Sequence, residues 1–262
     1  MTPTQNAIVA PDPGTVPGLG PAEPRRDQHF AKALVFTPHP DDAELGSGAT
    51  MARWASEGTE VVLCVVTNGA MGSNDPTVVR ADLIATREAE QRAAAAILGI
   101  AEVVFLGHED GYLEDSHELR RDMIREIRRH RPDVVVGPDP SMYYFGQQYL
   151  NHPDHRRVGE AFLAAVNPGA TTVPLYRAEL YDRGFEPHQV KAALLSLTTN
   201  GDYFVDAEGF LEVKLKALRA HVSQMTDWAG LEEFVTGMAA MIGKASGQGL
   251  THAESFKAFF FG

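Results

Sequence analysis

The sequence has 262 residues, of which 44% are hydrophobic, and its formal net charge is −12. This length allows one large domain or two small ones, and the excess of acidic side chains argues against nucleic acid or an anionic membrane as a general partner. The single cysteine, Cys64, cannot form an intrachain disulfide, which fits a reducing compartment.

The first thirty residues are rich in proline and glycine, which disfavour both helix and strand. They do not begin with basic residues followed by an apolar run, so they do not resemble a signal peptide. No stretch of the chain is long and apolar enough to suggest a membrane span. We therefore expect a disordered or extended arm over residues 1–30, a single domain over residues 31–262, and a cytoplasmic protein.

Apolar runs and helical patterns alternate from residue 32 onwards. Strands are predicted over residues 32–38, 60–69, 102–107 and 133–138, and helices over residues 43–59, 77–100 and 116–132. This order predicts a Rossmann-like α/β fold, with a mostly parallel sheet covered by helices on both faces. The less regular second half is expected to add a strand over residues 174–185 and helices over residues 208–225 and 228–247.

Polar loops follow the predicted strands. In a parallel sheet the carboxyl ends of the strands meet at one edge, and ligands bind there. The loop after the first strand lacks the G-x-G-x-x-G pattern, and no Walker-type phosphate loop occurs, so a nucleotide-dependent enzyme is disfavoured. Two of these loops carry similar motifs, "PHPDDAELG" from Pro38 and "NHPDH" from Asn151.

A single His-Pro-Asp motif is usually a turn with a capping aspartate. Two such motifs at strand ends of one sheet can instead bring two histidines and a carboxylate to one metal ion, the pattern of a catalytic zinc with an open position for water. Iron, cobalt and manganese also accept such ligands. The candidate residues are His39, Asp41, Asp42, His152, Asp154 and His155.

The same residues suit metal-assisted hydrolysis of an amide. Zinc in such a site lowers the pKa of a bound water from about 15.7 to near 7. Of the adjacent carboxylates Asp41 and Asp42, one can bind the metal while the other accepts the proton of this water. The extra histidine can face the developing oxyanion or protonate the leaving amine, and Asp154 can orient one of the histidines.

The stretch "PHPDDAELGSG" with the later "HPDH" resembles the LmbE-like (PIG-L) family of zinc-dependent N-acetylglucosamine deacetylases, over roughly residues 33–225. The resemblance implies the fold predicted above and a zinc cofactor. It also implies that His39, Asp42 and His155 are the metal ligands.

For catalysis, the resemblance implies that Asp41 is the general base. It implies that His152 stabilises the oxyanion or acts as the acid, with Asp154 beside it in the motif. The expected reaction is hydrolysis of the N-acetyl amide of an amino sugar or its conjugate, and the expected partner is that small molecule. The alternative is an amidase acting on a non-sugar or thiol-conjugate amide, and a binding protein without turnover is disfavoured because the full residue set is present.

Four residues are candidates for substrate binding. The resemblance implies Arg87, Asp110 and His221, although a surface ion pair, a turn and a helix-end cation are the ordinary explanations for these three. Tyr149 belongs to an aromatic loop over residues 142–149, whose rings can stack on a sugar, form a local hydrophobic plug or contact a second subunit. A homo-oligomer formed through this loop or the N-terminal arm is therefore also considered.

Overall fold

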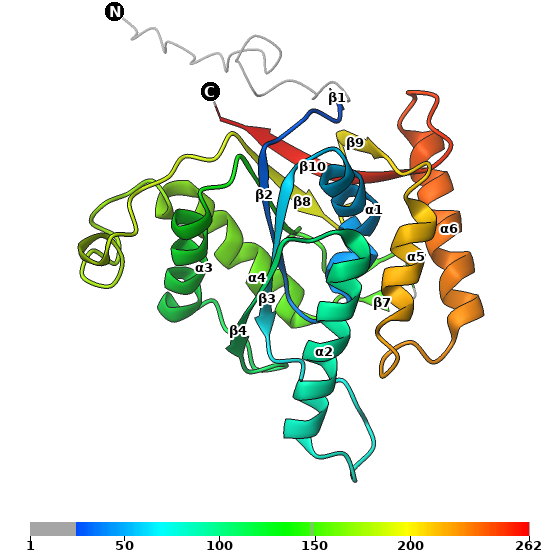
Figure 1. Ribbon diagram of the computed structural model, residues 1–262, viewed down its shortest axis with the longest axis horizontal. Coiled ribbons are helices and arrows are strands. Elements are labelled where there is room, and N and C mark those ends of the chain that lie inside the picture. The colour runs from blue at the N-terminus through cyan, green and yellow to red at the C-terminus, as the bar shows by residue number, and fades with distance from the viewer. Residues whose placement is uncertain (1–24, 148, 262) are drawn as a thin grey trace, which may run out of the picture.

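The protein folds around one eight-stranded sheet with helices on both faces (Figure 1), as seen in a computed structural model that describes residues 25–147 and 149–261. The strand order is β1-β9-β10-β8-β5-β2-β3-β4, and only β10 runs antiparallel to its neighbours. The mostly parallel α/β fold is therefore confirmed. Among the described residues, no helix is long and apolar enough to cross a membrane.

The strands of this sheet are short and mostly buried. They are β1 (Arg25–Arg26), β2 (Lys32–Thr37), β3 (Glu60–Thr67), β4 (Glu102–His108), β5 (Val134–Pro138), β8 (Ala192–Ser196), β9 (Tyr203–Asp206) and β10 (Ala253–Phe260). A separate hairpin pairs β6 (Tyr144–Phe145) with β7 (Tyr149–Leu150).

Six α-helices accompany the strands in the described part of the chain. They are α1 (Asp42–Ser56), α2 (Arg80–Leu98), α3 (His117–His130), α4 (Pro153–Ala164), α5 (Leu211–Arg219) and α6 (Trp228–Ala245), with a π-helical turn η2 (Ala165–Gly169) and a 3-10 turn η3 (Tyr181–Arg183). Two helix ends lie close to the predicted bounds of 116 and 100: the Ser116 side chain accepts the N–H of Leu119 at the start of α3, and Gly99 ends α2 with φ of 76°.

The strand predicted over residues 174–185 is wrong. Its backbone groups bond within the segment, for example from the N–H of Leu180 to the carbonyl of Tyr176, and it ends in η3. Local turns therefore use the donors and acceptors that a sheet would need. β10, which was not predicted from the sequence, enters the sheet between β9 and β8.

Residues 1–24 of the predicted arm lie outside the described residues. Residues 25–30 are extended and pack on the domain, since β1 pairs in parallel with β9 and Phe30 is buried against Trp54. The Trp54 indole and the Tyr203 hydroxyl both donate to the carboxylate of Asp27. The end of the predicted arm thus continues the sheet.

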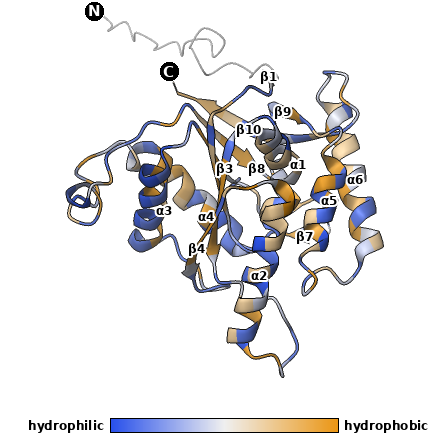
Figure 2. Ribbon diagram, in the orientation of Figure 1, coloured by the Kyte–Doolittle hydropathy of each residue, from blue (hydrophilic) through white to orange (hydrophobic). Residues whose placement is uncertain are grey.

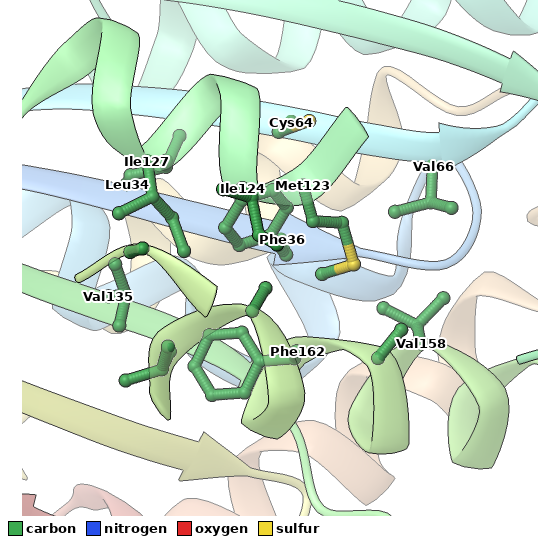
Figure 3. Packing of buried hydrophobic residues seen from close by; sticks show 14 of the residues in the cluster. Leu34, Phe36, Cys64, Val66, Met123, Ile124, Ile127, Val135, Val158 and Phe162 are labelled. Atoms are coloured by element: carbon green, nitrogen blue, oxygen red, sulfur yellow. The ribbon is translucent and has the colours of Figure 1, made fainter. Parts of the chain in front are cut away.

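Side chains alternate between the two faces of the central strands, which are buried on both sides. Leu34 and Phe36 of β2 face α3 and α4, where Phe36 packs edge-on against Phe162 with ring centroids 6.0 Å apart (Figure 3). Ala33 and Val35 face α1, α2 and α5. Helix α3 covers the face with Leu34 and Phe36 as an amphipathic helix, because it is largely hydrophilic apart from its buried stripe (Figure 2).

A break in α1 shapes the beginning of the candidate site. Ser47 has non-helical torsions (φ −150°, ψ 20°) between two glycines, residues that favour helix kinks. Glu254 of β10 accepts the N–H groups of the two residues after Gly48, and Lys214 of α5 donates to the carbonyl of Leu45. Lys214 and Glu254 also form an ion pair of 2.7 Å, and both are buried. This pair therefore satisfies the backbone groups that the kink exposes.

We predict that Glu254→Ala lowers the free energy of unfolding by about 3–5 kcal/mol, because it leaves the buried Lys214 ammonium without its partner. The matched control is Glu212→Ala, which removes an exposed pair with Lys216 on the same helix and should cost less than about 1 kcal/mol. Urea denaturation of the two variants measures the difference. Equal losses would show that the Lys214–Glu254 pair does not stabilise the kink.

Candidate active site

Both His-Pro-Asp motifs lie together at the carboxyl edge of the parallel strands. His39 follows β2, and Asp110 follows β4. His152 is the N-cap of α4, and Asp154 and His155 lie in the first turn of this helix. The topology that the sequence predicts therefore brings residues 115 positions apart into contact.

The nitrogen atoms of two histidines converge on one carboxylate oxygen. Oδ2 of Asp42 lies 2.9 Å from Nδ1 of His39 and 3.2 Å from Nε2 of His155. Burial opposes ionisation of Asp42, but the charge of His155 and hydrogen bonds with both histidines hold its pKa well below its usual range. The three side chains thus offer two imidazole nitrogens and an ionised carboxylate to a cation. This donor set fits a catalytic zinc ion.

The second ring nitrogen of His39 contacts two other carboxylates. Nε2 lies 3.0 Å from Oδ1 of Asp110 and 3.2 Å from Oδ2 of Asp154. Burial lowers the pKa of His39, but these contacts and the one with Asp42 outweigh burial and raise it well above its ordinary value. Backbone N–H groups of the loops after β3 and β4 donate to the two carboxylates at 2.9 and 2.8 Å. The ring is therefore held with Nδ1 toward Asp42.

These contacts change what was expected of two aspartates. Asp110, a predicted substrate contact, is only 3% exposed, and its carboxylate already contacts His39 and a backbone N–H. Asp154 lies 3.9 Å from Nδ1 of His152 and is closer to His39, so the histidine that it orients is His39. His39, Asp110, His152 and Asp154 form a second group of convergent donors. The first group is the predicted ligand set, and its Asp42 oxygen also accepts the backbone N–H of His39 at 3.0 Å.

Asp41 adopts an unusual backbone conformation next to this donor set. Its φ of 98° lies in the left-handed region, which costs a non-glycine residue about 1–3 kcal/mol unless its surroundings enforce it. Its N–H donates to Oε1 of Gln91 at 3.1 Å, and its Oδ2 lies 3.4 Å from the guanidinium of Arg87. Burial and the neighbouring charge of Asp42 raise the pKa of Asp41 to about 7. Such a carboxyl group is suited to proton transfer near neutral pH.

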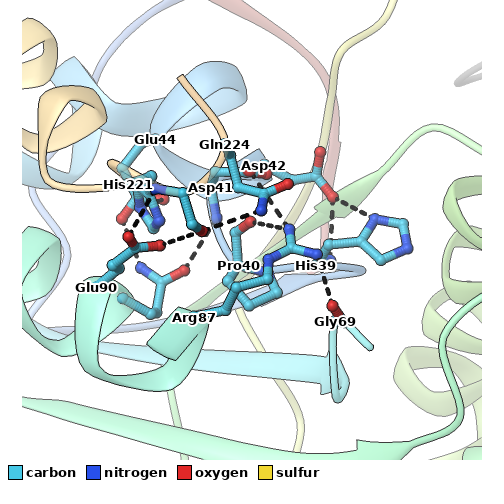
Figure 4. A network of polar contacts seen from close by, with 12 residues as sticks. His39, Pro40, Asp41, Asp42, Glu44, Gly69, Arg87, Glu90, His221 and Gln224 are labelled. Atoms are coloured by element: carbon cyan, nitrogen blue, oxygen red, sulfur yellow. Dashed lines mark hydrogen bonds and ion pairs between the residues drawn. The ribbon is translucent and has the colours of Figure 1, made fainter. Parts of the chain in front are cut away.

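A buried polar network stabilises the backbone of Asp41 through Gln91 (Figure 4). The amide of Gln91 that accepts from Asp41 also donates to Oε1 of Glu44 at 2.6 Å. The other oxygen of Glu44 lies 3.5 Å from Nε2 of His221. Glu44, Gln91 and His221 are all fully buried, so the network is shielded from solvent. It links the start of α1, the middle of α2 and the end of α5.

Arg87 and His221 lie in this supporting layer and not on the open side, where substrate contacts were predicted. Arg87 is 4% exposed, and its guanidinium donates to two loop carbonyls at 2.8 and 2.9 Å. A Cβ atom at Gly72 would lie 2.5 Å from this guanidinium, so the loop after β3 closes tightly over it. His221 is fully buried beside Glu44. Arg87 is thus placed to fix the loops around Asp41, whereas His221 contacts Glu44.

Glu44 and Gln91 were not among the site residues predicted from the sequence. Glu44 lies inside the first motif, two positions after Asp42. Gln91 lies four positions after Arg87, and therefore on the same face of α2. A glutamine on the buried face of an alanine-rich helix is a signal that could have identified it, because buried amides need partners.

His152 and Tyr149 are the most exposed of the predicted site residues. The ring of His152 lies 4.9 Å from that of His39, and its side chain is 41% exposed. The N–H of Asp154 donates to Nδ1 of His152, so a neutral His152 carries its proton on Nε2. Burial and the charge of His39 lower the pKa of His152. Tyr149, in β7, is 52% exposed, and burial raises the pKa of its hydroxyl.

Comparison with known proteins agrees with this geometry. The family PIG-L, described as GlcNAc-PI de-N-acetylase, matches residues 34–166, which include both His-Pro-Asp motifs. The chain belongs to the PIG-L family. Within this family of deacetylases, the His/Asp cluster is a group of residues that could hold a metal ion.

Two relatives and one solved structure extend the match beyond this segment. Diacetylchitobiose deacetylase of Thermococcus kodakarensis is 34% identical, over 82% of this chain and 79% of the relative. A 1D-myo-inositol 2-acetamido-2-deoxy-alpha-D-glucopyranoside deacetylase of Actinosynnema mirum is 30% identical, over 75% of this chain and 82% of the relative. The N,N'-diacetylchitobiose deacetylase structure from Pyrococcus horikoshii, in complex with its inhibitor MPG, superposes with a TM-score of 0.81 at 32% identity, covering 88% and 84% of the two chains.

We predict that Gln91→Leu lowers kcat by about tenfold to a hundredfold and leaves the bound metal unchanged. The variant removes the amide that fixes the backbone of Asp41, and small misplacements of a reacting group have effects of this size. Glu88→Gln, on the exposed side of the same helix, is the control and should retain activity. Loss of metal in Gln91→Leu, or full activity, would contradict a role in positioning Asp41.

Proposed function

We propose that this PIG-L protein hydrolyses the N-acetyl amide of an amino sugar or amino-sugar conjugate with the help of a divalent metal, most simply Zn²⁺. The observation that carries the proposal is the convergence of His39 Nδ1, Asp42 Oδ2 and His155 Nε2, with the Asp41 carboxyl group beside them. The reaction adds water across the C–N amide bond and yields acetate and a free amine.

His39, Asp42 and His155 would hold the metal, which supplies a Lewis acid for water and for the acyl carbonyl. The remaining steps belong to side chains of the chain itself. The Asp41 carboxylate accepts a proton from the attacking water as the new C–O bond forms. Neutral His152 donates a hydrogen bond from its Nε2–H to the developing oxyanion, and the proton that Asp41 accepted passes to the departing amine as the C–N bond breaks.

The class of substrate follows from the relatives together with the open side of the site. The two curated relatives are named for acetylated glucosamine units, one in a disaccharide and one attached to inositol. Tyr149 of the β6–β7 hairpin has an exposed aromatic ring and lies close enough to the site to be influenced by the charges of Asp42 and His39. Aromatic faces of this kind suit the apolar face of a pyranose ring. We therefore infer an N-acetylglucosaminide as the substrate.

The test is acetate release from a panel of N-acetylglucosaminides, with the metal content of each sample measured in parallel. The panel includes free N-acetylglucosamine, diacetylchitobiose and an inositol conjugate. We predict that Asp41→Asn reduces release at least about 100-fold, since a general base contributes this much, and that it retains the metal. Asp182→Asn, at an exposed ion pair with Arg177, is the control and should match the parent. An Asp41→Asn variant with nearly full activity would refute the assignment of the base.

The metal ligands are tested separately. We predict that His155→Ala binds less than about a tenth of the metal of the parent protein, because one of three protein ligands is lost. Measurement of bound metal by mass spectrometry after dialysis gives the result. Stoichiometric metal in His155→Ala would remove this residue from the ligand set. Bound metal in the parent without acetate release from any panel member would place the substrate among other amides.

A further inference from the structure

The last long helix, α6, has an apolar face that nothing in the described part of the chain covers. Only Val235, Ala239 and Gly243 are both apolar and buried, and they form one stripe at intervals of four residues. The helix packs on β10 and contacts α5, and the backbone of residues 250–251 closes over Gly243. The helix carries few charged residues for its length.

A second apolar stripe runs along the outward side of α6. Phe234, Met238 and Met241 are 54%, 36% and 59% exposed, and their spacing of four and three residues places them on one face. A helix that is apolar on opposite sides is normally buried on both. Single exposed apolar residues are common, but three large ones in one stripe mark an interaction surface.

Gly237 supports this interpretation. It lies in the middle of α6 beside the stripe, and a Cβ atom there would meet nothing within 4 Å. The fold of a single chain therefore does not require a glycine at this position. A glycine inside a helix costs about 1 kcal/mol relative to alanine. Close approach of another backbone would account for it.

We propose that α6 is the centre of a twofold-symmetric interface with a second copy of this chain, in which the two α6 helices pack antiparallel. The stripe is self-complementary in one antiparallel register. In this register the numbers of two residues that face each other across the interface sum to 475. Phe234 then faces the partner's Met241, and Gly237 faces the partner's Met238. Gly230 faces the partner's Ala245 at the ends of the contact. Twofold interfaces place the same patch of both subunits in contact, so such self-complementarity is what they require.

The residues that flank the stripe fit the same register. Glu233 and Lys244 are exposed on one flank, and the antiparallel arrangement brings Glu233 within two positions of the partner's Lys244 along the helix axis. Leu231 and Ile242, both half-buried, are brought together in the same way on the other flank. One edge of the helix pair is thus complementary in charge, and the other edge is apolar.

A second copy fits this face better than other occupants. An anionic membrane surface is disfavoured because the net charge is −12 and because a single lysine, Lys244, is too little positive charge on this face to attract it. An unrelated acidic or basic partner would find a single charge of each sign, Glu233 and Lys244, whereas a second copy pairs both. The proposal does not depend on the proposed enzymatic function.

The test uses the full chain and sedimentation equilibrium over a range of protein concentrations. We expect the parent to associate and Met241→Glu to halve the mass of the assembly, while its circular dichroism and acetate release stay unchanged. Ile97→Glu, which alters an apolar side chain exposed by 42% on α2, is the control and should keep the parent mass. A parent that is monomeric at all concentrations, or a Met241→Glu variant of unchanged mass, would overturn the proposal.

The register is tested by charge exchange and by cross-linking. Glu233→Lys or Lys244→Glu alone should weaken association, and the double exchange should restore it. Because the only native cysteine is buried, Met238→Cys should give a disulfide-linked dimer on oxidation, whereas Ala229→Cys, exposed on another side of α6, should not. Failure of the double exchange to restore association, or cross-linking through residue 229 alone, would contradict the antiparallel register.

Discussion

The carboxylate of Asp42 shared between two histidines is the constraint on which the candidate site depends. Three further aspartates, Asp41, Asp110 and Asp154, lie in the same small space at the edge of the sheet. Burial of so many carboxylates costs free energy unless positive charge compensates them. The histidines supply part of this charge, and a divalent cation between His39, Asp42 and His155 would supply the rest.

Much of the surrounding structure can be understood as support for this arrangement. The break in α1 separates the turn that carries Asp42 from the rest of the helix, and the buried Lys214–Glu254 pair satisfies its backbone groups. Arg87 and the Glu44–Gln91 pair hold the strained backbone of Asp41. These residues come from four different elements, so the geometry of the site depends on the tertiary packing of α1, α2, α5 and β10.

The features of the fold and site that depend on local sequence pattern could be predicted from the sequence. Apolar runs predict β2, β3, β4 and β5, and the parallel order places both His-Pro-Asp motifs at one edge. The sequence could not show that Asp110 and Asp154 both contact Nε2 of His39, because this depends on how two loops approach one ring. The strand expected over residues 174–185 failed for a similar reason: its apolar residues suit a strand, but its backbone groups form hydrogen bonds within the segment.

The supporting layer was the least predictable part of the site. Arg87 and His221 have residue types that often bind substrates, and only their burial reveals that they face the protein interior. Glu44 and Gln91 carry no motif of their own and acquire a role from their contacts with Asp41 and with each other. The roles of polar residues behind a site therefore have to be read from three-dimensional contacts.

The identity of the metal-binding atoms can be tested by an anomalous difference map from crystals of the zinc-loaded protein. We expect one strong peak about 2.0–2.2 Å from His39 Nδ1, His155 Nε2 and an Asp42 carboxylate oxygen. A peak on the other side of the ring, bound by His39 Nε2 with Asp110 and Asp154, would contradict it. That result would make Asp110 and Asp154 ligands and leave Asp42 without the role assigned to it.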